Sequence, residues 1–215
     1  MKSHVMHMAN EITQEKAKEI VLSLAAGSER TIIGIVGKPG GGKSTLSKYL
    51  LKGCDETLVS VLPMDGFHLS NKVLKSLGRS DRKGAPDTFD VKGFAEILNR
   101  VARDLENPIY YPIFDRSIEE SIAAQGVVLP STRVVIVEGN YLMHDRDGWQ
   151  EISPLLNQSW YAYLDEDIRI SRLISRHIAF GKDPESAKAW AKGSDQANAD
   201  LIEASVARCD FLIRS

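Results

Sequence analysis

The sequence predicts an α/β protein in which a mostly parallel sheet is flanked by helices on both faces. Two short apolar runs, T-I-I-G-I-V at residues 31–36 and R-V-V-I-V at residues 133–137, have the unbroken hydrophobic character of buried parallel strands. Stretches with a helical period alternate with such runs along the chain. The 215 residues suffice for one domain with its own core, and no repeat or flexible linker divides them.

The composition is that of an ordinary globular protein and narrows the classes of partner. A formal net charge of -2 gives no general attraction for nucleic acid. No apolar run approaches the ~20 residues that a membrane span needs, and the N-terminus lacks the basic and then apolar pattern of a secretory signal. We therefore expect a cytoplasmic protein that binds neither nucleic acid nor membrane. Cys54 and Cys209 lack metal-ligand spacing and are expected to be buried or half-buried free thiols.

The first elements are expected after a tail. Residues 1–8 contain three methionines and two histidines, and we expect a disordered tail or a remnant of cloning there, with a single domain over 9–215. Residues 11–26 have apolar positions near a 3.6-residue period, which predicts a helix that Gly27 ends. The pattern then predicts a strand over 31–36, a helix over 43–52 and a strand over 57–63.

Two insertions are expected in the rest of the chain. Residues 66–90 are mostly polar and are predicted to be an excursion with short helices. A second insertion, at about 181–193, is bracketed by Gly181 and Gly193 and is predicted to act as a movable lid. Between and after them we expect helices over 91–105, 166–180 and 195–206, and strands over 109–114, 127–130, 133–137, 159–164 and 211–213.

The strongest motif is the phosphate-binding pattern G-x-x-x-x-G-K-[ST], placed between a buried strand and a helix. Glycines let backbone N–H groups approach phosphate oxygens, and the helix N-terminus adds unpaired donors. Lys43 supplies a cation for the β- and γ-phosphates, and the Ser44 hydroxyl is expected to ligate Mg²⁺. The motif therefore predicts a P-loop NTPase that binds Mg-ATP through Gly37, Lys38, Pro39, Gly40, Gly41, Gly42, Lys43, Ser44 and Thr45.

Two carboxylates stand where apolar strands end, Asp65 after L-V-S-V-L-P-M and Glu138 after R-V-V-I-V. The carboxyl edge of a doubly wound sheet forms the ligand crevice, so both are expected near the phosphates. One can hold Mg²⁺ through water while the other accepts a proton from an incoming hydroxyl. A guanine-specific N-K-x-D motif is missing, because residues 71–74 read N-K-V-L; this favours ATP over GTP.

Basic residues recur on the helix expected from residue 166. Arg169, Arg172 and Arg176 have the spacing i, i+3, i+7, which places them on one stripe beside an apolar face. The stripe is either a solvated surface or a set of arginines that closes on the transferring phosphoryl group.

These motifs together resemble the uridine kinase, phosphoribulokinase and pantothenate kinase group of P-loop kinases. The resemblance runs from about residue 31 to the C-terminus, and the bacterial branch described as nucleoside-kinase-like or fructose-transport-system kinase-like is the most similar. The matching strings are G-K-P-G-G-G-K-S-T, L-P-M-D-G-F-H, R-K-G-A-P-D-T-F-D, Y-Y-P-I-F-D-R, V-I-V-E-G-N-Y-L, R-L-I-S-R-H, R-H-I-A-F-G-K and N-A-D-L-I. Uridine kinases typically have D-x-F-Y where this chain has D-G-F-H, which leaves the acceptor open.

The resemblance implies a role for each matching residue. Asp65 corresponds to the base for the acceptor hydroxyl, and Glu138 to the acid near magnesium and acceptor. His68 is a candidate contact to the acceptor, with a structural hydrogen bond as the alternative. The lid arginines implied by the resemblance are Arg172 and Arg176, and the acceptor-pocket residues are Arg82, Lys83, Asp87 and Arg116.

The motifs and the resemblance are consistent with two functions. The first is an ATP-dependent kinase that phosphorylates a hydroxyl of a sugar, a nucleoside or a pantothenate-like compound. The second is an ATP-binding regulator, for example a partner of a transporter, whose catalysis is vestigial. A homodimer is possible, because the helix expected over 11–26 can pack on its own sheet or on a second subunit.

Overall fold

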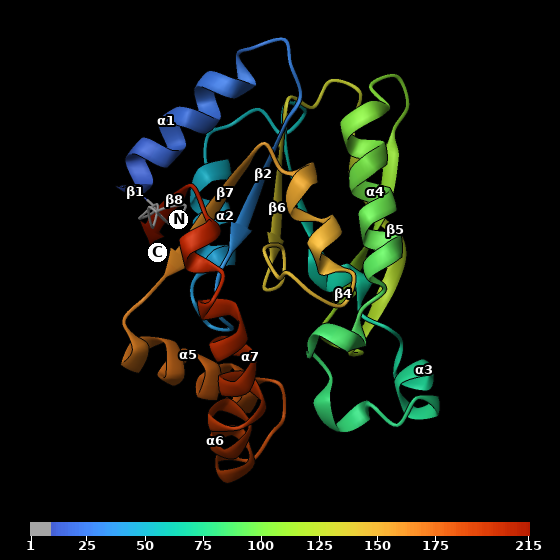
Figure 1. Ribbon diagram of the computed structural model, residues 1–215, viewed down its shortest axis with the longest axis vertical. Helices are drawn as coiled ribbons and strands as arrows, with labels where there is room; N and C mark the ends of the chain where they lie inside the picture. The colour runs from blue at the N-terminus through green and yellow to red at the C-terminus, as the bar shows by residue number, and fades with distance from the viewer. Residues whose placement is uncertain (1–9) are drawn as a thin grey trace, which may run out of the picture.

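A single parallel sheet organises the protein, whose computed structural model describes residues 10–215 (Figure 1). The tail expected over residues 1–8 lies outside the described residues. The sheet has six strands in the order β1-β8-β7-β2-β6-β3, and every adjacent pair is parallel. This confirms the predicted fold class. The strands are β1 (Asn10–Ile12), β2 (Thr31–Val36), β3 (Val59–Pro63), β6 (Val134–Gly139), β7 (Gln158–Tyr163) and β8 (Phe211–Arg214).

Helices cover both faces of the sheet because alternate residues of each buried strand point to opposite sides. On one face, Ala17 and Val21 of helix α1 pack with Ile33, Ile136 and Trp160 of the sheet. Helix α1 thus buries its apolar side on the sheet of its own chain. On the other face, α4 packs against the alternate residues of β2, β3 and β6. The helices are α1 (Gln14–Ala25), α2 (Lys43–Leu51), α3 (Asn71–Ser76), α4 (Val91–Arg103), α5 (Glu166–Ala179), α6 (Pro184–Lys192) and α7 (Ser194–Glu203).

Two strands differ from the sequence-based expectation. Residues Asn10–Ile12 form β1 beside β8, so the first helix begins later, at Gln14, where the Thr13 hydroxyl accepts a hydrogen bond from the Lys16 backbone. Strand β5 spans Glu120–Val128 and forms an antiparallel hairpin with β4 (Ile109–Asp115), whereas a strand was expected only over 127–130. Most of β5 is exposed, so its hydrophobic pattern is weak and backbone pairing defines it.

The topology gathers the predicted site at the carboxyl edge of the sheet. Strand β2 leads into the phosphate loop, and its neighbour β6 ends in Glu138 and Gly139. Pro63 of β3 pairs with Glu138, which places the following turn beside the same edge. Helices α5, α6 and α7 extend beyond this edge (Figure 1); we call them the lid helices. The predicted lid segment contains α6, and α7 begins one residue earlier than expected.

The two cysteines have the burial that the sequence analysis expected. Cys54 is half-buried, Cys209 is buried, and both are free thiols. Within residues 10–215, no helix has the length and apolarity required to cross a membrane.

Candidate active site

The phosphate loop has the backbone that its glycines permit. Gly40 and Gly42 adopt φ values of 75° and 90°, a region that disfavours residues with a Cβ. At Gly37, an added Cβ would come within 2.5 Å of the Ala162 carbonyl oxygen. Helix α2 begins at Lys43, directly after this loop, so the unpaired N–H groups of its first turn face the same space. The loop is therefore shaped for a phosphate chain.

The Lys43 ammonium lies at the centre of the site and is held by oxygens. It donates to the Gly37 carbonyl at 2.8 Å, to the Lys38 carbonyl at 3.1 Å and to Asn140 Oδ1 at 2.6 Å. Burial lowers its pKa to about 8, although the nearby carboxylates of Asp65 and Glu138 oppose the change. A bound phosphate group would offset the cost of burying the ammonium, because it places negative charge beside Lys43.

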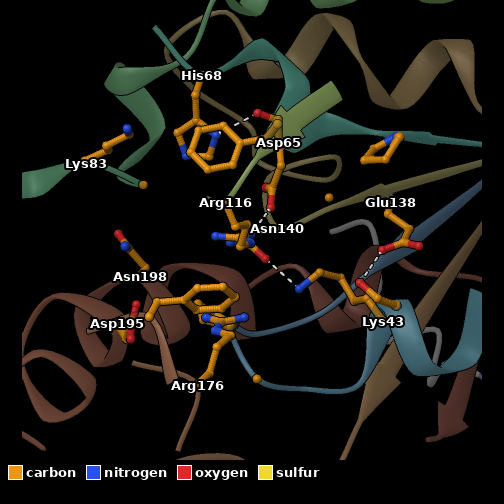
Figure 2. Close-up of a pocket in the computed structure, with 18 of the residues that line it drawn as sticks. Lys43, Asp65, His68, Lys83, Arg116, Glu138, Asn140, Arg176, Asp195 and Asn198 are labelled. Atoms are coloured by element: carbon orange, nitrogen blue, oxygen red, sulfur yellow. Dashed lines mark hydrogen bonds and ion pairs between the residues drawn. The ribbon is translucent and has the colours of Figure 1, made fainter. Parts of the chain in front are cut away.

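Ser44 and Glu138 form a second pair at the phosphate loop, and Figure 2 shows Glu138 on the same side of the cavity as Lys43. The Ser44 hydroxyl donates to Glu138 Oε2 at 2.7 Å. The structure therefore brings together the two residues that the sequence predicted for the metal. Among residues 10–215, no group of three or more His, Cys, Asp or Glu residues is arranged to hold a metal ion by itself.

Asp65 lies opposite Lys43, in the short 3₁₀ turn Met64–Phe67 that follows β3. Gly66 is needed in this turn because a Cβ there would lie 1.9 Å from the Pro112 carbonyl oxygen. Asp65 Oδ2 accepts a hydrogen bond from Arg116 at 2.6 Å. Burial raises the pKa of the carboxyl, but His68 in its protonated form, Arg116 and Lys43 together lower it by more, so its pKa lies below its ordinary value. Asp65 is therefore a carboxylate at neutral pH.

His68 closes one side of the site. Its Nδ1 lies 2.8 Å from the Asp65 carbonyl oxygen, and its ring stacks between Phe89 and Phe114, with centroid distances of 4.0 and 4.8 Å. Burial lowers the pKa of the imidazole more than the nearby Asp65 raises it, so the ring is neutral at pH 7. His68 thus lines the cavity while also making the structural hydrogen bond that was the alternative.

The segment around residues 79–88 divides into residues that reach the cavity and residues that do not. Lys83 lines the cavity and donates to Asn71 Oδ1 at 2.7 Å. Arg82 and Asp87 are outside the cavity lining and form an ion pair at 2.7 Å with each other. The placement of these two residues in the acceptor pocket is therefore corrected: they fold the segment, since Asp87 also pairs with Arg79.

Two aromatic residues fix the same segment from the core. The Tyr141 hydroxyl donates to the Gly84 carbonyl at 2.6 Å, and Trp149 Nε1 donates to the Pro86 carbonyl at 3.1 Å. The position of Lys83 in the cavity wall thus depends on buried contacts of residues 84–86.

The arginines of α5 separate into two groups. Arg172 and Arg176 line the cavity, as predicted. Arg169 is 1% exposed and donates to the Pro39 carbonyl at 3.1 Å, so it supports the phosphate loop from behind. It lies neither on a solvated surface nor at the cavity, which were the two environments expected for the arginine stripe. Lys38 also turns away from the cavity and pairs with Glu203 at 2.7 Å, which leaves only its backbone for phosphate binding.

These elements enclose a cavity of about 740 Å³ between the phosphate loop, the Asp65 turn, the β4–β5 hairpin and the lid helices. Several polar residues of its wall had no role assigned from the sequence, among them Asn140, Asp195 and Asn198. Asn140 follows the E-G pair at the end of β6, which was the available signal. Asp195 and Asn198 come from α7, and only the string N-A-D-L-I indicated Asn198.

Comparison with known proteins agrees with this geometry. The sequence pattern of the Phosphoribulokinase / Uridine kinase family matches residues 32–215. YggC of Escherichia coli (strain K12) is 35% identical over 178 residues, which are 80% of this chain and 73% of YggC. Protein C227.14 of Schizosaccharomyces pombe, provisionally named a uridine kinase, is 29% identical over 196 residues, or 86% and 83% of the two chains.

A solved structure shares both sequence and fold. It belongs to a protein of Silicibacter sp. TM1040 that is provisionally described as a fructose transport system kinase. The two chains are 36% identical, the match covers 94% of this chain and 98% of the other, and the TM-score is 0.83. With its phosphate loop, strand-end carboxylates and cavity arginines in the arrangement described above, the chain is a member of the phosphoribulokinase/uridine kinase family of P-loop kinases.

Proposed function

We propose that this ATP-dependent kinase transfers the γ-phosphoryl group of Mg-ATP to a hydroxyl of a small acceptor, either a sugar, a nucleoside or a pantothenate-like compound. The observation that carries the proposal is Asp65, an ionised carboxylate that faces Lys43 across the cavity and is oriented by Arg116. An isolated hydroxyl is a poor nucleophile, and a carboxylate in this place can accept its proton as the new P–O bond forms.

The phosphate side of the reaction is assigned to the loop. Lys43 exchanges its bond to Asn140 for phosphate oxygens, and backbone N–H groups of Gly40–Gly42 bind the rest of the chain. The Ser44 hydroxyl and the Glu138 carboxylate are hard oxygen donors that fit Mg²⁺, together with water and phosphate oxygens. When bound, Mg²⁺ neutralises charge on the phosphates.

Asp65 and Glu138 then have different tasks. Glu138 is hydrogen-bonded to Ser44 at the loop, whereas Asp65 is bonded to Arg116 on the hairpin side of the cavity. Asp65 therefore takes the proton of the acceptor hydroxyl, whose oxygen attacks the γ-phosphorus while ADP leaves. Arg172 and Arg176 supply positive charge from the lid helices as negative charge moves to the leaving oxygen.

The test is ADP release over a panel of sugars, nucleosides and pantothenate, with wild type, Asp65→Asn and the control Asp81→Asn. Asp81 is exposed and lies outside the cavity lining, so its variant retains wild-type turnover. Asp65→Asn keeps ATP binding and loses roughly 10²–10⁴-fold in kcat. Full activity of Asp65→Asn excludes Asp65 as the base. ATP binding without turnover on any hydroxyl compound favours the regulatory alternative.

A further inference from the structure

Two polar residues of α7 point into the acceptor half of the cavity. Asp195 and Asn198 are three positions apart and therefore share one helix face. They are 9% and 6% exposed, and both belong to the cavity wall. Figure 2 shows them across the open space from His68 and Lys83. They thus occupy the wall of the cavity that faces the Asp65 turn.

The hydrogen-bonding capacity of these two residues is largely unused. The Asn198 carboxamide has no hydrogen-bond partner among residues 10–215. Asp195 Oδ2 lies 2.7 Å from His177 Nε2, and its second carboxyl oxygen has no partner within the same residues. These free atoms are open to the cavity and not sealed in the core, since Tyr161 Oη is the only fully buried side-chain N or O atom without a partner among residues 10–215. A pair left open on a cavity wall is typical of groups that bind a ligand.

The chemistry of the pair restricts what it binds. A carboxylate accepts hydrogen bonds and repels phosphate or carboxylate groups, so the ligand part that meets Asp195 must be a donor. Asn198 both donates and accepts, as does a hydroxyl. Two neighbouring hydroxyls of one acceptor match this pair, with the first donating to Asp195 and the second bonded to Asn198.

The aromatic residues of the cavity argue against a nucleobase as the main contact. The His68 ring packs against both Phe89 and Phe114, at interplanar angles of 40° and 47°. The Trp190 ring is covered by the Lys182 ammonium, 4.4 Å from its centroid. Phe180 is the cavity aromatic that keeps an exposed ring, so a base can meet that ring alone. Stacking of a base between two rings would require His68 or Lys182 to leave its contacts.

We propose that Asp195 and Asn198 form the hydroxyl-recognition site of the acceptor, and that the acceptor is a sugar or polyol without a nucleobase. This inference rests on the proposed kinase function, because a third hydroxyl of the same molecule is the one that reaches Asp65. The site lies on the lid helices, so acceptor binding and the position of the lid are linked through these two contacts.

The first experiment measures steady-state kinetics of Asn198→Ala and Asn198→Ser against the control Asp200→Asn. Asp200 is exposed on the same helix and lies outside the cavity lining. We expect Asn198→Ala to raise the KM for the sugar or polyol roughly 10- to 100-fold, with the KM for ATP unchanged. Asn198→Ser restores part of the loss, and Asp200→Asn matches wild type. Melting temperatures with ATP present identify a variant that fails to fold, in which case Asn198→Ser carries the comparison.

The second experiment removes the hydroxyl from the acceptor instead of the amide from the protein. An acceptor analogue that lacks the hydroxyl bound by Asn198 loses affinity for wild type but binds Asn198→Ala as well as the parent compound does, because the contact is already absent. The proposal is contradicted if the affinity lost with each single-deoxy analogue adds in full to the affinity lost in Asn198→Ala. Nucleosides that are turned over better than their free sugars also contradict it.

The two proposals fail in different ways. If wild type phosphorylates no hydroxyl compound, the kinase proposal fails. If wild type phosphorylates a sugar or polyol and Asn198→Ala leaves its KM unchanged, only the recognition site is wrong.

Discussion

The protonation of Lys43 makes ATP affinity depend on pH in the alkaline range. The pKa of the free ammonium is about 8, and bound phosphates raise it by adding negative charge beside it. ATP binding is therefore favoured while Lys43 is protonated. The affinity that the ammonium contributes is lost as pH rises above the pKa of Lys43 in the free protein. Between pH 7 and pH 9 the protonated fraction falls about tenfold, which corresponds to a loss of about 1.4 kcal/mol in binding free energy.

The assay is isothermal titration calorimetry of an ATP analogue in buffers of different ionisation enthalpy. At pH 9 we expect uptake of close to one proton per nucleotide, and at pH 7 an uptake about tenfold smaller from this lysine. Lys48→Ala is the matched control, since Lys48 is exposed on the same helix and outside the cavity lining. Lys43→Arg removes the proton uptake, because the guanidinium stays charged throughout. Equal affinity and no proton uptake at pH 9 refute the reasoning.

Three further predictions concern the environment of Asp65, the glycine of its turn and a control glycine outside the turn. Arg116→Met removes a positive charge that holds the Asp65 pKa down, so the acid limb of the kcat/KM profile moves to higher pH; a pH–rate profile that stays in place contradicts the assignment. Gly66→Ala places a Cβ 1.9 Å from the Pro112 carbonyl oxygen and is expected to lower the free energy of unfolding by about 3 kcal/mol or more, measured by urea denaturation. Gly78→Ala tests a glycine with positive φ and open surroundings, and only the smaller backbone cost of about 1 kcal/mol is expected there.

Local patterns were sufficient for the phosphate side of the site. The phosphate loop is one continuous segment, and its spacing and flanking elements are visible in the sequence. Asp65 and Glu138 were found because parallel strands end at one edge of the sheet, so a carboxylate at each end must lie near the loop. Asn140 appeared in the sequence analysis only as one residue of the string V-I-V-E-G-N-Y-L. Its role was not predicted, because its hydrogen bond to Lys43 joins residues 97 positions apart.

The positions of the other site residues depend on long-range packing. Arg169 and Arg176 lie on one side of α5, but seven residues are about 10 Å along the helix axis, so one meets the back of the phosphate loop and the other meets the cavity. Arg82 and Asp87 were expected at the acceptor, and instead they bind each other. Asp195 and Asn198 reach the cavity because of the way the lid helices fold back, which no local spacing reveals.

The measurement that tests the central claim most directly is a ³¹P NMR spectrum of wild-type protein with Mg-ATP and the acceptor panel. Phosphoryl transfer to a hydroxyl predicts a new phosphate-ester resonance that grows in step with ADP and disappears with Asp65→Asn. Release of inorganic phosphate without an ester, or an ester that forms equally fast with Asp65→Asn, contradicts the account.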